Sequence, residues 1–186
     1  MANLSTSVKH LALLAGMAVV FFGCESAEND PTGQLKHELC QAELALNERN
    51  YAKAQKIADK VVTEAFDGPN NWRRGNLLHN GFRIMGMAAL ENGDIEAAKA
   101  HLLNSAVTHM GSPQLNSFGP NMSLAQALLN QGEREFVLEY LNLCKRFWDT
   151  PELAGWIEEI EEGGTPNFGA NLLYGVDLPG SKACQN

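Results

Sequence analysis

The residues best suited to metal or acid–base chemistry are the histidines and cysteines, and they are widely scattered along the chain. The closest pair is His37 and Cys40, three residues apart on what reads as a helix. A structural zinc site needs four such ligands, and no second close pair completes the set. We therefore expect neither a metal site nor a cofactor.

Catalysis without a metal would need a nucleophile with an oriented base, or a paired acid and base. His37, His79, His101 and His109 each lie in a helical pattern with no catalytic motif around them. The G-x-S-x-G and H-E-x-x-H motifs and the phosphate-binding glycine loop do not occur in the sequence. The sequence thus favours a protein that is not an enzyme, while a site assembled from distant segments stays open.

The charge balance argues against a nucleic-acid partner. The 186 residues include 14 Lys and Arg against 22 Asp and Glu, a formal net charge of −8. Proteins bind the phosphate backbone by neutralising it with Lys and Arg. The same excess of acid gives no support for binding anionic lipid headgroups.

The first 23 residues have the features of a secretory signal. Lys9 and His10 precede an uncharged run, residues 11–22, and twelve residues are too few to cross a bilayer as a helix, which takes about 20. A buried helix or a retained anchor is the alternative.

The run ends in the segment FFGC, which resembles the lipobox of bacterial lipoprotein precursors. Phe21, Gly23 and Cys24 match that pattern, whereas Phe22 stands where a small residue is usual. The resemblance implies that Cys24 becomes the first mature residue and carries the lipid. The residue after Cys24 is Glu25, whereas Asp at this position would imply retention at the inner membrane. The resemblance therefore implies anchoring in the outer membrane, facing the periplasm.

Three further cysteines are Cys40, Cys144 and Cys184. An exported protein meets an oxidising compartment, so one disulfide with one thiol left over is one interpretation. The other is two small buried residues within helices and a free thiol in the polar tail. The sequence leaves both open.

Helical periodicity governs residues 34–162, which we predict to form one helical domain. Residues 24–33 are polar and contain Pro and Gly, which predicts a flexible tether. We expect residues 110–121 to form a loop and residues 163–186 an irregular tail. No strand-like alternation of useful length occurs, so the predicted fold class is all-α. The expected helices cover residues 34–46, 51–66, 72–92, 95–109, 122–130, 133–147 and 151–162.

Three pairs of these helices repeat one arrangement of small residues on both sides of a short turn. The turns are NERNYAKA, ENGDIEAA and NQGEREFV, displaced by 44 and then 39 residues. Small side chains let two helix axes approach to the short end of the usual ~8–10 Å. One hairpin cannot bury its apolar face alone, so we expect about three stacked antiparallel hairpins. The aligned sets include Ala42, Gly86 and Ala125; Ala54, Ala98 and Val137; and Val61, Ser105 and Cys144.

The second unit resembles the tetratricopeptide repeat, on Gly86, Gly93, Asp94, Ala98, Leu102 and Ser105. The first and third units resemble it with departures, because Arg49 stands where Gly is usual and Val137 where Ala is usual. The resemblance covers residues 35–148. A generic solenoid of helical hairpins would meet much of the same pattern.

The resemblance implies a right-handed solenoid, capped by a terminal helix, whose first helices line a concave groove that binds a peptide. Amides and arginine could bond a partner's backbone or carboxylates, and methionine adapts to varied apolar contacts. An ordinary solvated helix face, or core, is the alternative for each position. The groove positions that match in this chain are Lys36, Glu43, Asn47, Asn80, Arg83, Met87, Met122 and Gln126.

A second candidate surface is the loop segment that contains Trp72, Arg73 and Arg74. Trp and Arg are enriched in binding hot spots. The alternative places Trp72 in the hairpin seam with the arginines in water. The function we expect is therefore an envelope-anchored scaffold that binds a protein or peptide, with a purely structural subunit of an envelope assembly as the main alternative.

Overall fold

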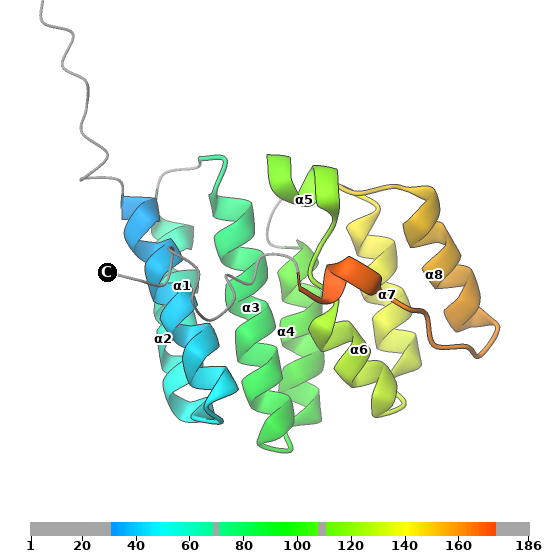
Figure 1. Cartoon of the computed structure of the whole chain (residues 1–186), viewed down its shortest axis with the longest axis horizontal. Helices are drawn as coiled ribbons and strands as arrows, with labels where there is room; N and C mark the ends of the chain where they lie inside the picture. The colour runs from blue at the N-terminus through cyan, green and yellow to red at the C-terminus, as the bar shows by residue number, and fades with distance from the viewer. Residues whose placement is uncertain (1–30, 69–70, 108–110, 174–186) are drawn as a thin grey trace, which may run out of the picture.

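The computed structural model describes residues 31–68, 71–107 and 111–173, and within these ranges all the regular secondary structure is helical, with no strand. This confirms the predicted all-α class. The predicted signal, the predicted lipidation site Cys24, and Cys184 lie outside the described residues. None of the described helices is both long enough and apolar enough to span a membrane. The helices are α1 Pro31–Asn47, α2 Tyr51–Asp67, α3 Arg74–Glu91, α4 Ile95–Val107, α5 Pro113–Phe118, α6 Ser123–Asn130, α7 Arg134–Cys144 and α8 Pro151–Glu161, followed by the 3-10 helix η2 Gly169–Leu172 (Figure 1).

Two boundaries differ from the prediction. Helix α1 begins at Pro31, so residues 31–33 of the predicted tether are helical. Helix α5 lies in the predicted loop, and it begins where Ser112 Oγ accepts a hydrogen bond from the Leu115 amide at 3.0 Å. The next residue is Pro113, and proline suits the first turn of a helix because it lacks the N–H that has no partner there. Thr150 begins α8 in the same way, so the signal was present in the sequence at both places.

The three short turns form as the sequence predicts. Gly93 has φ +82°, in the left-handed region, and Asp94 Oδ1 accepts a hydrogen bond from the Ala97 amide at 3.0 Å, which caps α4. Gly132 has φ +89° in the third turn. Arg49 takes the equivalent conformation in the first turn, with φ +59°, although it has a side chain. The first turn therefore keeps the same backbone conformation although Arg49 replaces the glycine of the other two turns.

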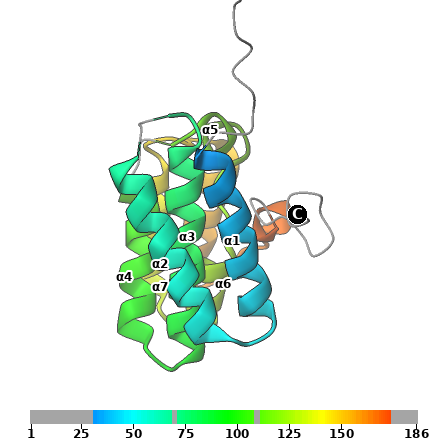
Figure 2. The ribbon, with the colours of Figure 1, turned by 90° about the vertical axis from the view of Figure 1, so that its left-hand side faces the viewer.

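The helices pack against their neighbours along the chain in two layers. Contacts join α1 to α2, α2 to α3, α3 to α4, α6 to α7 and α7 to α8. Helix α3 also contacts α1 and α6, and α4 contacts α7. In Figure 2, α1, α3 and α6 lie toward one side of the molecule and α2, α4 and α7 toward the other. We call the side formed by α1, α3 and α6 the first-helix face.

The aligned small residues lie where helices touch. A Cβ atom added at Gly86 would overlap Leu124 Cδ2 and lie 3.2 Å from the Cβ of His101. Close approach of α3 to α4 and α6 therefore depends on the missing side chain. Of the other residues in the three aligned sets, Ser105 is 1% exposed and the rest are completely buried: Ala42, Ala54, Val61, Ala98, Ala125, Val137 and Cys144.

Glycine substitutions test this close packing. A Cβ at Gly75, in α3, would overlap the Gly111 carbonyl oxygen, so Gly75→Ala should lower the free energy of unfolding by about 1–3 kcal/mol. Gly155 lies in α8 with no atom within 4 Å of an added Cβ. Gly155→Ala should raise the free energy of unfolding by about 0.5–1 kcal/mol, because alanine is more favourable than glycine inside a helix. Urea denaturation monitored by circular dichroism measures the stability of both variants. Equal stabilisation by the two substitutions would contradict the close contact at Gly75.

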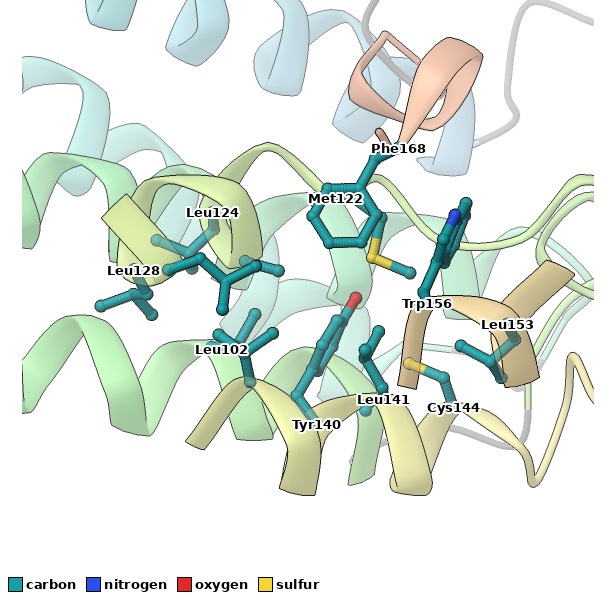
Figure 3. Packing of buried hydrophobic residues seen from close by; sticks show 14 of the residues in the cluster. Leu102, Met122, Leu124, Leu128, Tyr140, Leu141, Cys144, Leu153, Trp156 and Phe168 are labelled. Atoms are coloured by element: carbon teal, nitrogen blue, oxygen red, sulfur yellow. The ribbon is translucent and has the colours of Figure 1, made fainter. Parts of the chain in front are cut away.

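Buried side chains form two clusters. The first joins α1, α2 and α3, and the second extends from Ala89, near the end of α3, to residues beyond α8 (Figure 3). Phe168 follows α8 and is completely buried, with its ring centroid 5.0 Å from that of Trp156 and nearly perpendicular to it. Residues 163–168 have no helix or strand, as predicted for an irregular tail, and residues 169–172 form the short 3-10 helix η2. The burial of Phe168 shows that this irregular segment nevertheless contributes to the core.

Candidate binding surface

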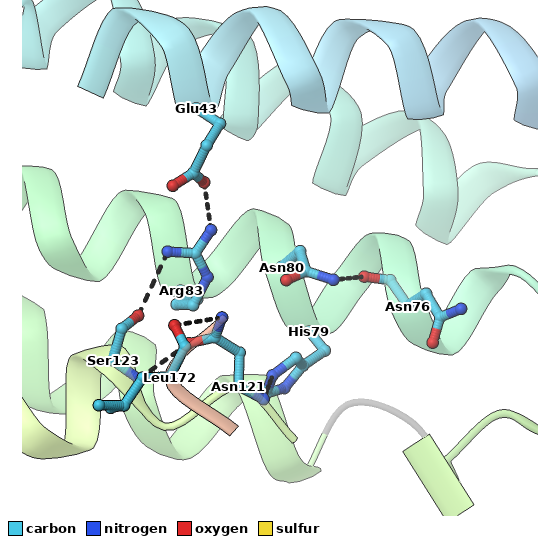
Figure 4. A network of polar contacts seen from close by, with 8 residues as sticks. All are labelled: Glu43, Asn76, His79, Asn80, Arg83, Asn121, Ser123 and Leu172. Carbon is cyan, nitrogen blue, oxygen red and sulfur yellow. Dashed lines mark hydrogen bonds and ion pairs between the residues drawn. The ribbon is translucent and has the colours of Figure 1, made fainter. Parts of the chain in front are cut away.

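A buried polar network links the three helices of the first-helix face (Figure 4). The guanidinium of Arg83, on α3, forms an ion pair with Glu43 on α1. Its other terminal nitrogen donates a hydrogen bond to Ser123 Oγ on α6 at 3.3 Å. The Arg83 and Glu43 side chains are only 4% and 11% exposed. Both partners are supplied by helices packed on either side of α3, so this network stabilises the stacking.

A second polar contact joins α3 to the segment that leads into α6. The backbone N–H of Asn121 donates to His79 Nε2 at 3.0 Å. Because Nε2 accepts, the proton of the neutral ring is on Nδ1, which lies 3.2 Å from the Ser105 carbonyl oxygen. His79 is 1% exposed and bridges three segments. Its role is to satisfy buried polar groups of the backbone.

The segment that follows α8 lies on the α6 end of the first-helix face (Figure 1). The Met122 amide donates to the Asn171 carbonyl oxygen at 2.8 Å, and Asn121 Nδ2 donates to the Leu172 carbonyl oxygen at 3.3 Å. Asn171 Nδ2 in turn donates to the carbonyl oxygens of Phe118 and Pro120 at 2.9 and 3.0 Å. Part of this face is therefore covered by the protein's own chain.

The eight predicted groove residues do not form one open surface. Met122 is completely buried and belongs to the core, which corrects its assignment to the groove. Glu43 pairs with Arg83, whereas Asn80 Nδ2 donates to the Asn76 carbonyl oxygen of its own helix. With exposed fractions of 8%, 3% and 7%, these three residues are not accessible to a partner in this structure. A polar residue on a helix pattern gives no indication of whether it meets water or another chain segment. The accessible members are Lys36 and Asn47, which are exposed, and Met87 and Gln126, which are partly exposed.

The second predicted surface is open. Trp72 is 60% exposed, so the interpretation that it packs in the hairpin seam is wrong. Arg73 holds its guanidinium carbon 4.7 Å from the Trp72 ring centroid. Arg74 lies 5.7 Å from the ring of Phe66, which is 40% exposed, and donates from Nη2 to its carbonyl oxygen at 3.0 Å. We call these four residues the aromatic–arginine surface.

Sequence reasoning did not identify Phe66 as part of this surface. The inward positions of α2 are Ala54, Ala58, Val61 and Ala65, and all four are buried. Phe66 comes one residue after Ala65 and so points away from that stripe. The sequence could have indicated Phe66, because it is an aromatic residue outside the buried stripe of α2 and only six residues before Trp72.

The ionisable groups inside the fold serve structural contacts. A hydrogen bond to Glu96 raises the pKa of Lys99, which also lies 3.1 Å from Glu133 at the start of α7. Burial lowers the pKa of His101 and raises that of the Cys144 thiol. Among residues 31–68, 71–107 and 111–173, no three His, Cys, Asp or Glu side chains are grouped so that they could hold a metal ion.

Comparison of the chain with family models, with curated proteins and with solved structures gives no match. The function of the protein must therefore be inferred from its own residues. Two regions matter: the first-helix face, whose centre is buried and whose α6 end carries the segment after α8, and the exposed aromatic–arginine surface between α2 and α3.

Proposed function

We propose that this protein is a protein-binding scaffold of the bacterial envelope. In this proposal α1–α2, α3–α4 and α6–α7 are three tetratricopeptide-like hairpins stacked as a right-handed solenoid, and α8 is the terminal cap. The three-residue turns and the buried small residues at equivalent positions support it. Cys24 would carry the lipid that anchors the domain to the outer membrane, facing the periplasm, as the sequence pattern at residues 21–24 implies.

The partner binds at the aromatic–arginine surface, and the observation that carries this proposal is the exposure of Trp72 beside a guanidinium group. Leaving a large aromatic side chain in water forgoes about 1.5–3 kcal/mol of burial free energy. A partner that covers Trp72 and Phe66 recovers that energy, and Trp and Arg are the residue types most enriched in binding hot spots. Two adjacent arginines favour a partner surface that presents carboxylates among apolar side chains.

The accessible part of the first-helix face remains a second candidate region for a partner peptide. Asn121 and Met122 already bind two carbonyl oxygens of the chain's own segment at residues 171–172. These hydrogen bonds support the idea that the first-helix face can bind a polypeptide through its backbone. Lys36, Asn47, Met87 and Gln126 are the residues predicted to contribute.

A double substitution at the aromatic–arginine surface tests the proposal. Full-length protein is bound to a support, exposed to envelope extract, and the main co-purifying protein is identified and measured by quantitative mass spectrometry. Trp72→Ala with Arg73→Glu should lower its recovery about 10–30-fold, because hot-spot residues contribute about 2 kcal/mol or more. Recovery should also fall as salt is raised, since exposed charges are screened.

The matched control is Phe118→Ala, which removes another exposed aromatic side chain, 53% exposed, from a different part of the molecule. It should leave recovery unchanged. Loss with Lys36→Glu but not with the double substitution would move the partner to the first-helix face. Recovery only within an envelope complex of fixed stoichiometry would favour the purely structural role. A hydrolytic activity that is lost on changing one histidine would favour an enzyme.

A further inference from the structure

Exposed apolar side chains gather at one end of the helical bundle. We call the end where α1, α3 and α8 begin and α2, α4 and α7 finish the loop end (Figure 1). Among the described residues, five large apolar side chains are exposed, and four of them belong to segments at this end. They are Phe66 in the last turn of α2, Trp72 just before α3, Val107 at the end of α4 and Phe118 at the end of α5.

Contacts between the helices place these segments together. Helix α3 packs against α2 and α4 in antiparallel pairs, so both of those helices finish near its start. Helix α5 lies there too, because Asn76 Nδ2, near the start of α3, donates to Gln114 Oε1 on α5 at 2.8 Å. The four apolar side chains therefore come from several segments and are spread over the end of the bundle.

The described chain also begins at the loop end. Helix α1 pairs with α2 in an antiparallel hairpin, so Pro31 lies at the end where α2 finishes (Figure 2). The residues that precede Pro31 are attached to the domain at this end. In the proposed function they carry the membrane anchor, which would bring this end of the domain closest to the bilayer.

The two ends of the bundle differ in charge. In the connections and adjoining helix turns of the loop end, basic and acidic residues balance: Arg73, Arg74, Lys145 and Arg146 against Glu64, Asp67, Asp149 and Glu152. At the opposite end acidic residues outnumber the basic residues Arg49, Lys53 and Arg134, and they include Glu91, Asp94, Glu96, Glu133, Glu161 and Glu162. The net negative charge of the chain is therefore concentrated away from the loop end.

The length of the bundle keeps this acidic end away from a surface at the loop end. Helix α3 has 18 residues and is about 27 Å long, at a rise of 1.5 Å per residue. Exposed charges are screened over about 8–10 Å at physiological ionic strength. The acidic end therefore repels an anionic surface at the loop end only weakly. The net charge of the whole chain gives no support for binding anionic headgroups, but it does not describe this end.

We propose that the loop end rests on the surface of a phospholipid bilayer. Exposed apolar patches rimmed by polar groups mark interaction surfaces, and Trp is enriched at the level of the lipid headgroups. The Trp72 ring can enter the boundary of the acyl chains while Arg73, 4.7 Å from that ring, binds a phosphate. This inference rests on the envelope location in the proposed function. A protein partner that covers Trp72 takes the place of the bilayer there.

Trp72 can report this contact directly. The other two tryptophans, Trp148 and Trp156, are only 4% and 6% exposed and belong to the core. Full-length protein is mixed with vesicles of phosphatidylcholine and phosphatidylglycerol that contain a lipid brominated near the headgroup end of its acyl chains. Bromine quenches an indole that it contacts, so wild type should lose emission and Trp72→Phe should lose none. Binding of other parts of the chain to the vesicles does not give this signal.

Two variants test the rest of the loop end without changing Trp72. Lys145→Glu with Arg146→Glu should lower the quenching at least about threefold, because two basic residues near an anionic membrane change the contact equilibrium about 10–30-fold. Phe118→Ala should lower it at least about twofold, because an apolar contact is lost. The matched controls are Lys53→Glu with Lys56→Glu, toward the opposite end, and Leu173→Ala, an exposed apolar residue that follows η2. Both controls should leave the quenching unchanged.

An unquenched Trp72 would overturn the proposal, whether or not the protein sediments with the vesicles. Quenching that neither loop-end variant lowers would also overturn it. Circular dichroism checks that each variant is folded. The two loop-end variants should leave recovery of the protein partner unchanged, so a failure of the membrane contact is distinguishable from a failure of the proposed function.

Discussion

Arg83→Glu is expected to lower the free energy of unfolding by about 3–5 kcal/mol. The substitution replaces the guanidinium that pairs with Glu43 by a second carboxylate in the same buried space. It also removes the hydrogen bond to Ser123 and so loosens the link between α3 and α6. From the sequence alone, this change would be expected to weaken partner binding and leave the helices intact. Burial of Arg83 predicts loss of stability instead.

Urea denaturation monitored by circular dichroism measures this effect, and Lys36→Glu is the matched control. It makes the same charge reversal on α1 at an exposed position, where substitutions usually change stability by less than about 0.5 kcal/mol. A paired replacement, Glu43→Leu with Arg83→Met, should restore most of the stability, because apolar residues can substitute for a buried ion pair. Equal stability of Arg83→Glu and Lys36→Glu would show that the pair contributes little.

Phe168→Ala is the second change with a large expected effect, a loss of about 3–5 kcal/mol. Phe168 is completely buried, and its ring contacts Trp156, whose centroid lies 5.5 Å from that of Trp148. Removing the ring leaves a cavity beside the Trp156 indole and loosens the segment that carries η2. Tryptophan fluorescence during urea denaturation reports directly on this region.

The control for Phe168 is Leu173→Ala, near the end of the same segment but 61% exposed. It should change stability by less than about 0.5 kcal/mol. If Phe168→Ala and Leu173→Ala were equally mild, residues 163–173 would not contribute to the core. If the first change is severe, the C-terminal segment is an integral part of the domain.

These expectations bear on which surface is free to bind. Because Glu43 and Arg83 are buried and the backbone of residues 171–172 is bonded to Asn121 and Met122, the first-helix face offers a partner few accessible groups at its middle and its α6 end. The aromatic–arginine surface combines exposure with binding-type residues, and for that reason the proposed partner is placed there. The two regions are separable by experiment, since the Arg73 guanidinium lies over the Trp72 ring, whereas Glu43, Arg83 and Ser123 link the helices of the first-helix face.

Local patterns determined a large part of this protein. The period of the apolar residues predicted the all-α class, and Gly93 with Asp94 marked a turn and a cap that form as expected. The small residues Ala54, Gly86 and Ala98 predicted where helices touch. These features follow from sequence because helix period, caps and turn residues depend on neighbours only a few positions away. Helix α5 could also have been found from Ser112 and Pro113.

Only the tertiary structure decided which polar residues are buried and what they meet. Glu43 and Arg83 are 40 residues apart, and Ser123 lies 40 residues further on, so their contact depends on which helices stack. Met122 enters the core and Phe168 completes it for the same reason. A helical period places a side chain on a face of its own helix, but the segment that covers that face comes from elsewhere in the chain.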